Sequence, residues 1–343
     1  MKHTNAPAVF AQTNDAERNQ VASFSRGADG ALRPIGLSDT GGRGTGEPHL
    51  PSQGSLTVTR DARRLLVANG GSDDISVFEI AADGLRLTDR APSGGHAPVS
   101  VTAHGRLVYA VNRSGGIAGF ELTDDARLSP LAGSARALGS ADSDPAQIAF
   151  TPDGRAVVVT ERNKDAISVF AIDAKGRASA PTTFPSSGAT PYGFDFTPAG
   201  DLVVTEAFGG AIGAAAASSY RLGAGGIEPV SPSVADTRSE VCWAVAARDG
   251  ASVYVTNFGD GTISRYAVSA DGALELAEAV AASTTPGVKG IRDAARSADG
   301  RFLYALDADA RRVFAWRIAD DGRLDPVGSV DGLPATVAGL ASV

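Results

Sequence analysis

An aromatic residue recurs seven times along the chain, each time in a short apolar stretch that reads as a strand. The copies are Phe24, Phe78, Phe120, Phe170, Tyr220, Tyr266 and Trp316, and consecutive copies are separated by 54, 42, 50, 50, 46 and 50 residues. A period near fifty residues with strand-like units is typical of a repeat architecture. Because a unit of this length cannot bury its own apolar face, the repeat predicts one domain whose units cover one another.

Each unit reads as four strands. In residues 147–184 the segments QIAFT, AVVVTE and AISVFAI are rich in β-branched and apolar residues, and a fourth strand leads to Phe184. The turns TPDGR and DAKGR contain Asp-Gly or Lys-Gly, which tolerate positive φ. The six complete units are 54–91, 99–133, 147–184, 192–231, 241–280 and 290–329.

The two ends of the chain supply a seventh unit. Three strands are expected near 8–14, 19–26 and 32–38, and one near 336–342. Pairing 336–342 with 8–40 closes a ring and removes two exposed sheet edges. The sequence therefore predicts an all-β fold in which residues 1–343 form a single domain, a seven-bladed β-propeller with four antiparallel strands per blade.

The loop lengths give the disc two different faces. Both short turns of each unit fall at one end of the strands, and the longer, more variable loops fall at the other end. We call the second end the top face. Variable loops on a rigid scaffold are where binding sites usually lie, so the site is expected at the top of the central channel.

Charge and composition limit the partners and the location. The net charge is −8, which disfavours a nucleic-acid partner because phosphate binding needs a basic surface. No apolar run reaches the length of a membrane span, and the N-terminal residues lack a signal-peptide pattern. With Cys242 as the only cysteine, we expect a cytoplasmic monomer with a small-molecule substrate and no membrane contact.

Several motifs resemble one known family. They are SQGSLTVTRDARRLLVANGGSDDISVF, PVSV, PAQIAFTPDGRAVVVTE, TPYGFDF and VCWAVAARDG, and together they span nearly the whole chain. They are similar to the lactonase family of seven-bladed propellers, which includes propeller-type 6-phosphogluconolactonases and carboxy-muconate lactonising enzymes. The resemblance implies an enzyme that opens or closes a lactone.

The chain departs from that family at basic positions. The resemblance implies a His near the start of the blade 147–184, an Arg-His pair near the start of the next blade, and a Glu ending its second strand. Here the first two places read Ala146-Gln147 and Tyr192-Gly193, and only Glu206 has a counterpart. Without those basic groups, the resemblance favours an unphosphorylated lactone.

Comparison of the units with each other gives a first set of candidates. The second strands end on Asn14, Asn69, Asn112, Glu161, Glu206, Asn257 and Asp307. Asn and Asp suit a turn, where a short polar side chain bonds nearby backbone. Glu161 and Glu206 break the pattern on neighbouring blades, and two carboxylates beside one pore would have different pKa values. They are our candidates for general acid and base, or else solvated carboxylates paired with a cation such as Arg162.

The start of the innermost strand gives a second set. It places Gln53, Gln147, Tyr192, Trp243, Arg292 and Asp293 around the pore mouth, with Asn69, Asn257 and Arg113 nearby. Aromatic walls with a few polar groups are typical of a small-molecule site. The alternative is that Tyr192 and Trp243 only plug the channel.

Histidines on top-face loops complete the candidates. His96 could assist proton transfer or, with Arg113 and Arg292, hold a substrate carboxylate, and His49 could contact substrate. No spacing typical of a metal site or a phosphate loop is present, so we expect neither a metal nor a cofactor.

Three hypotheses follow for the activity. The first is metal-free hydrolysis or formation of a lactone by carboxylate and His acid–base catalysis. The second is a non-catalytic propeller that binds a metabolite or protein. The third is an isomerase or cyclase that uses the same pocket.

Overall fold

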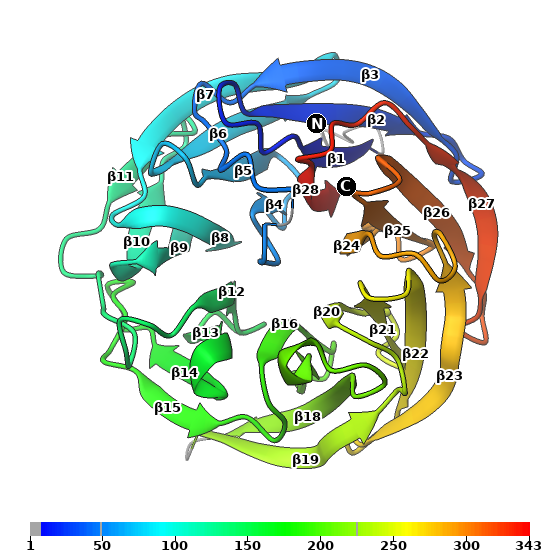
Figure 1. Ribbon diagram of the computed structural model, residues 1–343. Helices are drawn as coiled ribbons and strands as arrows, with labels where there is room; N and C mark the ends of the chain where they lie inside the picture. Colours follow the sequence, from blue (N-terminus) through cyan, green and yellow to red (C-terminus); the bar gives the residue numbers. More distant parts are fainter. Residues whose placement is uncertain (1–7, 49, 224–225) are drawn as a thin grey trace.

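The strands of this protein form seven separate four-stranded sheets arranged in a ring (Figure 1). The computed structural model describes residues 8–48, 50–223 and 226–343. Within each sheet the strands are antiparallel, and the chain runs from the innermost strand outwards in six of the seven sheets. This arrangement confirms the predicted all-β, seven-bladed propeller.

The strands are assigned to blades in chain order. Blade 1 contains β28 (Ala338–Ser342), β1 (Ala8–Gln12), β2 (Gln20–Arg26) and β3 (Leu32–Asp39), and blade 2 contains β4 (Leu56–Val58), β5 (Arg64–Asn69), β6 (Asp74–Ala81) and β7 (Gly84–Pro92). Blade 3 contains β8 (His96–His104), β9 (Leu107–Ser114), β10 (Gly116–Leu122) and β11 (Leu128–Pro130), and blade 4 contains β12 (Pro145–Phe150), β13 (Ala156–Glu161), β14 (Ala166–Ala171) and β15 (Thr182–Pro185). Blade 5 contains β16 (Pro191–Phe196), β17 (Leu202–Glu206), β18 (Ala216–Gly223) and β19 (Gly226–Ala235), and blade 6 contains β20 (Val241–Ala246), β21 (Ser252–Asn257), β22 (Thr262–Val268) and β23 (Leu274–Ser283). Blade 7 contains β24 (Ile291–Arg296), β25 (Phe302–Asp307), β26 (Arg312–Ile318) and β27 (Leu324–Val330).

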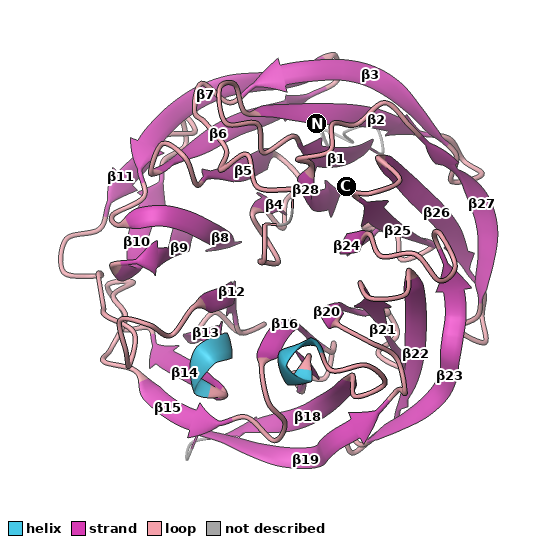
Figure 2. Ribbon diagram, viewed as in Figure 1, coloured by secondary structure: helices cyan, strands magenta, loops and turns pink. Residues whose placement is uncertain are grey.

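The ring closes as the sequence predicts. Strand β28 pairs antiparallel with β1, with Phe10 opposite Ala341, so both ends of the described chain lie in blade 1 (Figure 1). In the described part of the chain two short 3-10 helices interrupt the pattern, η1 (Arg162–Lys164) and η2 (Phe208–Gly210), each after a second strand that ends on Glu (Figure 2). Among the described residues, no helix is long and apolar enough to cross a membrane.

The recurring aromatic residues pack the blades against one another. All seven lie on the third strand of a blade in chain order or on its ring-closing equivalent, and none exposes more than 4% of its surface. Phe170 of blade 4, for example, joins Tyr109 and Ile117 of blade 3 in one apolar cluster. Burying large apolar side chains between sheets supplies the main driving force for the ring.

Polar side chains on the innermost strands join neighbouring blades. The amide of Gln147 donates to the carbonyl of Phe194 (2.9 Å) and accepts from its N–H (2.7 Å). Asp293 Oδ2 accepts the N–H of Leu340 (2.9 Å) in the same manner. Innermost strands are sheet edges, so these contacts satisfy backbone groups that would otherwise face the channel unpaired.

One contact crosses the channel. Gln53, in the loop between β3 and β4, donates its backbone N–H to Ala146 O (3.1 Å) and its side-chain amide to Ala244 O (3.1 Å). A Cβ on Gly193 would lie 2.6 Å from the backbone oxygen of Cys242, so only glycine fits beside this contact. Blade 2 is thus tied to blades 4 and 6 through one side chain and its backbone.

Candidate functional site

A β-bulge recurs where the innermost strands begin at the top face. The pairing of innermost and second strands shifts register between Pro145 and Gln147, between Pro191 and Phe194, between Val241 and Ala244, and between Ile291 and Asp293. An extra residue at a bulge leaves the ladder and turns its side chain in a new direction. The bulges therefore position Tyr192, Trp243 and Arg292 differently from the rest of their strands.

Tyr192 is the centre of this region. Its side chain lies against Trp243, with ring centroids 5.8 Å apart in an edge-on arrangement, and the Arg162 guanidinium lies 4.9 Å from the Tyr192 ring centroid. Thr160 holds the backbone by donating to Tyr192 O (2.6 Å). The Tyr192 hydroxyl makes no hydrogen bond with any described residue. Burial raises the pKa of this phenol, so it stays protonated near neutral pH.

Arg162 and Asp144 lie beside Tyr192, and sequence reasoning did not select either as a site residue. Arg162 Nη2 is 2.5 Å from Asp144 Oδ2, and the two side chains are 13% and 30% exposed. Asp144 is in the loop before β12 and Arg162 begins η1, and both lie outside the columns that repeat from blade to blade. The one available signal was that Arg162 directly follows Glu161 in the sequence.

Arg292 approaches the same place from blade 7. It is 7% exposed, and its guanidinium lies 3.7 Å from the centroid of the Phe258 ring. Among the described residues no carboxylate comes within 4.0 Å of it, and its Nε is buried without an acceptor. Burial lowers the pKa of the guanidinium, although it remains a cation at neutral pH.

We name these six side chains the mouth cluster: Asp144, Arg162, Tyr192, Trp243, Phe258 and Arg292. Two buried donors in it, Trp243 Nε1 and Arg292 Nε, have no partner among the described residues. Buried polar groups in proteins are nearly always hydrogen-bonded, and exceptions need an explanation. A ligand rich in acceptor oxygens would provide one.

Cys242 lies under the mouth cluster. Burial raises the pKa of its thiol to about 12, and its Sγ contacts Glu240 O at 3.4 Å. A thiol that stays protonated is a weak nucleophile. Cys242 is therefore a packing residue.

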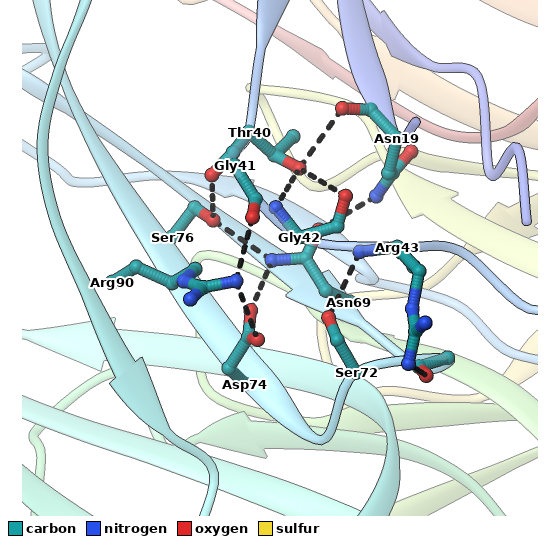
Figure 3. Close-up of polar contacts among 11 residues, drawn as sticks. Asn19, Thr40, Gly41, Gly42, Arg43, Asn69, Ser72, Asp74, Ser76 and Arg90 are labelled. Atoms are coloured by element: carbon teal, nitrogen blue, oxygen red, sulfur yellow. Dashed lines mark hydrogen bonds and ion pairs between the residues drawn. The ribbon is translucent and has the colours of Figure 1, made fainter. Parts of the chain in front are cut away.

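The second strands end in a different kind of polar group (Figure 3). Asn69 donates to Asp74 Oδ1 (2.7 Å) and Ser76 Oγ (2.8 Å) and accepts from Asn19 Nδ2 (2.7 Å). Ser76 Oγ donates in turn to Thr40 O (2.7 Å), in the loop before β4. Asn69 thus ties the third strand of its blade to the preceding loop, and it does not face the channel.

Three of the other strand ends repeat this arrangement. Asn257 donates to Ser264 Oγ (2.8 Å), which lies 3.0 Å from Asp236 Oδ2 in the loop before β20. Glu161 accepts from Ser168, and Glu206 Oε1 accepts from Ser218 Oγ (2.5 Å) and from the N–H of Gly188 (2.7 Å). We call these groups, with that of Asn69, the strand-end networks.

The two glutamates do not share a pore. Both are buried, at 1% and 0% exposure, and each faces the loop that precedes its own blade. Burial raises the pKa of Glu161, opposed by hydrogen bonds from Ser168 and Ser143 and by the charge of Lys164, with no contribution from Glu206. The geometry expected from the sequence, two interacting carboxylates beside the channel, is wrong. Whether either residue moves a proton stays a prediction.

The remaining candidates lie elsewhere. His96 is exposed and pairs with Asp73, with Nδ1 2.9 Å from Oδ2, while Arg113 lies 3.7 Å from Glu47. The Ala97 N–H and His96 lower the pKa of Asp73. These contacts are on blades 2 and 3, away from the mouth cluster, and His49 falls outside the described residues.

Gln53, Gln147 and Asp293 contact neighbouring backbone, as described above. Burial raises the pKa of Asp293 to about 8, which is consistent with a position sealed between β24 and β28. The polar groups of these three side chains therefore form hydrogen bonds between blades.

A groove on the opposite face contains none of the predicted site residues. It has a volume of about 720 Å³ and lies between blades 4 and 5, where Asp153, Phe184 and Leu222 form part of its wall. Within the described ranges, no group of three or more His, Cys, Asp and Glu side chains is arranged to hold a metal ion.

Comparisons with known proteins agree with the fold. The profile described as "Lactonase, 7-bladed beta-propeller" matches residues 17–137, 118–207 and 210–337. No curated protein sequence matches the chain.

Solved structures are similar over almost the whole chain. A protein from Bacteroides fragilis, proposed to be a 6-phosphogluconolactonase, is 18% identical with a TM-score of 0.75, covering 99% of both chains. A protein from Lactobacillus plantarum is 16% identical with a TM-score of 0.77, covering 99% of this chain and 100% of that one. The periplasmic gluconolactonase of Pseudomonas aeruginosa is 18% identical with a TM-score of 0.71, covering 98% and 99%.

Proposed function

Since the chain belongs to the lactonase family of seven-bladed β-propellers, we propose that it hydrolyses a small, unphosphorylated lactone at the mouth cluster. The observation that carries the choice of site is the set of unpaired donors around Tyr192, next to the Arg162–Asp144 pair. No other candidate group combines a partly exposed carboxylate, a cation and a protonated hydroxyl at the top of the channel.

Each group has a role in the proposed reaction. Asp144 accepts a proton from water, whose oxygen attacks the lactone carbonyl carbon. Arg162 stabilises the negative oxygen of the tetrahedral intermediate, as positioned donors do in other acyl transfers. The carbon–oxygen bond of the ring then breaks, and Tyr192 gives its proton to the leaving alkoxide. Asp144 returns the proton from water to Tyr192 through solvent, so the products are one hydroxy acid and the original enzyme.

The absence of basic residues at Ala146-Gln147 and Tyr192-Gly193 supports an unphosphorylated substrate. Arg162 is already paired with Asp144, so it has limited capacity to neutralise a phosphate dianion.

The test is to measure hydrolysis of a panel of γ- and δ-lactones through the protons that the acid product releases. Asp144→Asn should lower kcat by about 100-fold, the usual contribution of a general base. Asp142→Asn is the matched control, because Asp142 lies in the same loop, is 73% exposed and pairs with Lys164. Equal rates for the two variants would show that Asp144 is not the base, and no turnover on the whole panel would favour a non-catalytic binding propeller.

A further inference from the structure

We propose that Arg292 binds a carboxylate carried by the substrate, so that the preferred ligand is a lactone bearing one carboxylate group. This inference rests on the proposed function and specifies the substrate class of the same site. In this proposal Arg292 binds the carboxylate of the substrate, whereas Arg162 and Asp144 act on its lactone carbonyl.

The burial of Arg292 without a counter-ion is the main observation. Two partly buried arginines of the described chain have a carboxylate partner: Arg26, whose side chain is 7% exposed, lies 2.8 Å from Asp299, and Arg265 lies 2.7 Å from Glu278. Removing a cation from water is costly unless a partner compensates. Arg292 stands apart from these arginines, and a bound anion would supply the missing partner.

The position of Arg292 is fixed before any ligand arrives. Its guanidinium is stacked on the Phe258 ring at 3.7 Å, and the bulge between Ile291 and Asp293 sets its direction. A planar guanidinium held on an aromatic face can present two parallel donors to a carboxylate. Such preorganisation reduces the entropy lost on binding.

The surrounding charges favour a single negative charge. Glu240 and Asp309 are near enough to act electrostatically on Arg292, but Glu240 pairs with Lys289 at 2.5 Å and Asp309 is exposed. Both carboxylates would repel a phosphate dianion more strongly than a carboxylate. The single positive charge of Arg292 therefore matches a monoanion.

The place of Arg292 relative to Tyr192 sets the shape of the ligand. Arg162, Asp144 and Arg292 are all near enough to act electrostatically on the Tyr192 hydroxyl. A ligand with its lactone carbonyl at Arg162 and a carboxylate at Arg292 would cover the Tyr192 hydroxyl and the Trp243 indole.

The test uses two lactones that differ in one group. γ-Carboxy-γ-butyrolactone carries a carboxylate where γ-valerolactone carries a methyl. Arg292→Gln should lower kcat/KM by roughly 30-fold for the first, the loss of a charge-assisted hydrogen bond, and by less than threefold for the second. Arg292→Lys, which keeps the charge, should recover part of the loss. Equal losses for the two lactones would overturn the proposal.

Arg301→Gln is the matched control. Arg301 also lies over an aromatic ring, with Cζ 5.2 Å from the centroid of Phe302, but it is exposed and belongs to a tight turn at the opposite face. This variant should leave both rates unchanged, and thermal unfolding should show that Arg292→Gln is folded at the assay temperature.

A binding experiment separates this inference from the proposed function. Tetrahydrofuroate has the same ring and carboxylate without the carbonyl, so it can be titrated by calorimetry whether or not lactones are hydrolysed. Binding at least tenfold weaker to Arg292→Gln than to the wild type and Arg301→Gln supports the carboxylate site, even if no lactone reacts. Equal binding to all three proteins, or tighter Arg292-dependent binding of inorganic phosphate, would refute it.

Discussion

The strand-end network around Asn69 and the mouth cluster are both polar and at the top of the disc, yet they differ in how completely they are hydrogen-bonded. Around Asn69 each donor meets an acceptor within the chain, as Figure 3 shows for the amide, Asp74 and Ser76. Around Tyr192 two buried donors, Trp243 Nε1 and Arg292 Nε, have no partner among the described residues. A closed network stabilises the fold, whereas unpaired donors are available to a ligand.

The difference also shows which sequence signal was misleading. Glu161 and Glu206 stood out because they replace Asn at a repeated position. In the structure each makes the same kind of contact as Asn69 or Asn257, to a serine of the third strand. A longer side chain in a repeat can do the same structural job when the following loop also changes, and here both glutamates are followed by a 3-10 helix.

The largest expected effect is on stability, in a strand-end network. Asn69→Ala removes three buried hydrogen bonds and leaves Asp74, Ser76 and Asn19 without this partner. We expect the free energy of unfolding to fall by about 4 kcal/mol, measured by urea denaturation. Asn163→Ala, at an exposed position in η1, is the control and should change it by less than about 0.5 kcal/mol. Similar losses of stability for the two variants would show that the Asn69 hydrogen bonds contribute no more than an exposed side chain does.

The next effect is a pH dependence of stability. Burial raises the pKa of Asp236, in the Asn257 network, to about 6, opposed by the N–H of Arg238 and by Ser264. The native state then holds a proton that the unfolded chain releases, so the stabilisation is complete below pH 4 and is lost as pH rises from about 4 to about 6.

Asp236→Asn should remove this dependence. The difference in free energy of unfolding between wild type and variant should change by about 3 kcal/mol from pH 4 to pH 7, in the direction that weakens the wild type at pH 7. Asp320→Asn, at an exposed position, should give a constant difference. A constant difference for Asp236→Asn as well would mean that this carboxyl is ionised throughout.

In the mouth cluster the effect should fall on rate. Tyr192→Phe keeps the ring contacts with Trp243 and Arg162 and removes only a hydroxyl that no described residue bonds. We expect kcat on the best lactone to fall about 30-fold with a melting temperature within a few degrees of the wild type. Lower stability at full rate would instead identify Tyr192 as a channel plug.

The smallest effect is expected at Glu206. Glu206→Gln keeps an acceptor oxygen for Gly188 and Ser218, so we expect kcat/KM to change less than threefold. Glu161→Gln in the preceding blade should behave in the same way. A loss of about 100-fold in either variant would restore the sequence-based assignment of that glutamate as the base.

The fold could be predicted from the sequence because every blade repeats the same local signals. The aromatic spacing, the Asp-Gly turns and the three-plus-one strand count each report on short stretches of chain, and each blade packs mainly against its neighbours. Ring closure followed from counting strands at the two ends.

The site could be predicted only in part. The start of the innermost strand drew attention to Tyr192, Trp243 and Arg292; the structure places Tyr192 against Trp243 and Arg162, and Arg292 against Phe258. The same position in other blades holds side chains such as Gln147, which bond the next strand. Whether a polar group bonds the backbone or stays unpaired depends on bulges and on segments outside the repeated strands. The contact of Asp144 with Arg162 comes from two such segments.

The side chain of Gln53 has a mechanical consequence. It connects blade 2 to blade 6, on nearly opposite sides of the circle, through hydrogen bonds to Ala244. If blades contacted only their neighbours, small tilts of every blade could widen the central channel. The hydrogen bonds between Gln53 and Ala244 cross the channel and resist that widening. The width of the channel is therefore set by contacts across it as well as by contacts between neighbouring blades. The spacing between Tyr192 and Arg292 should vary little with temperature.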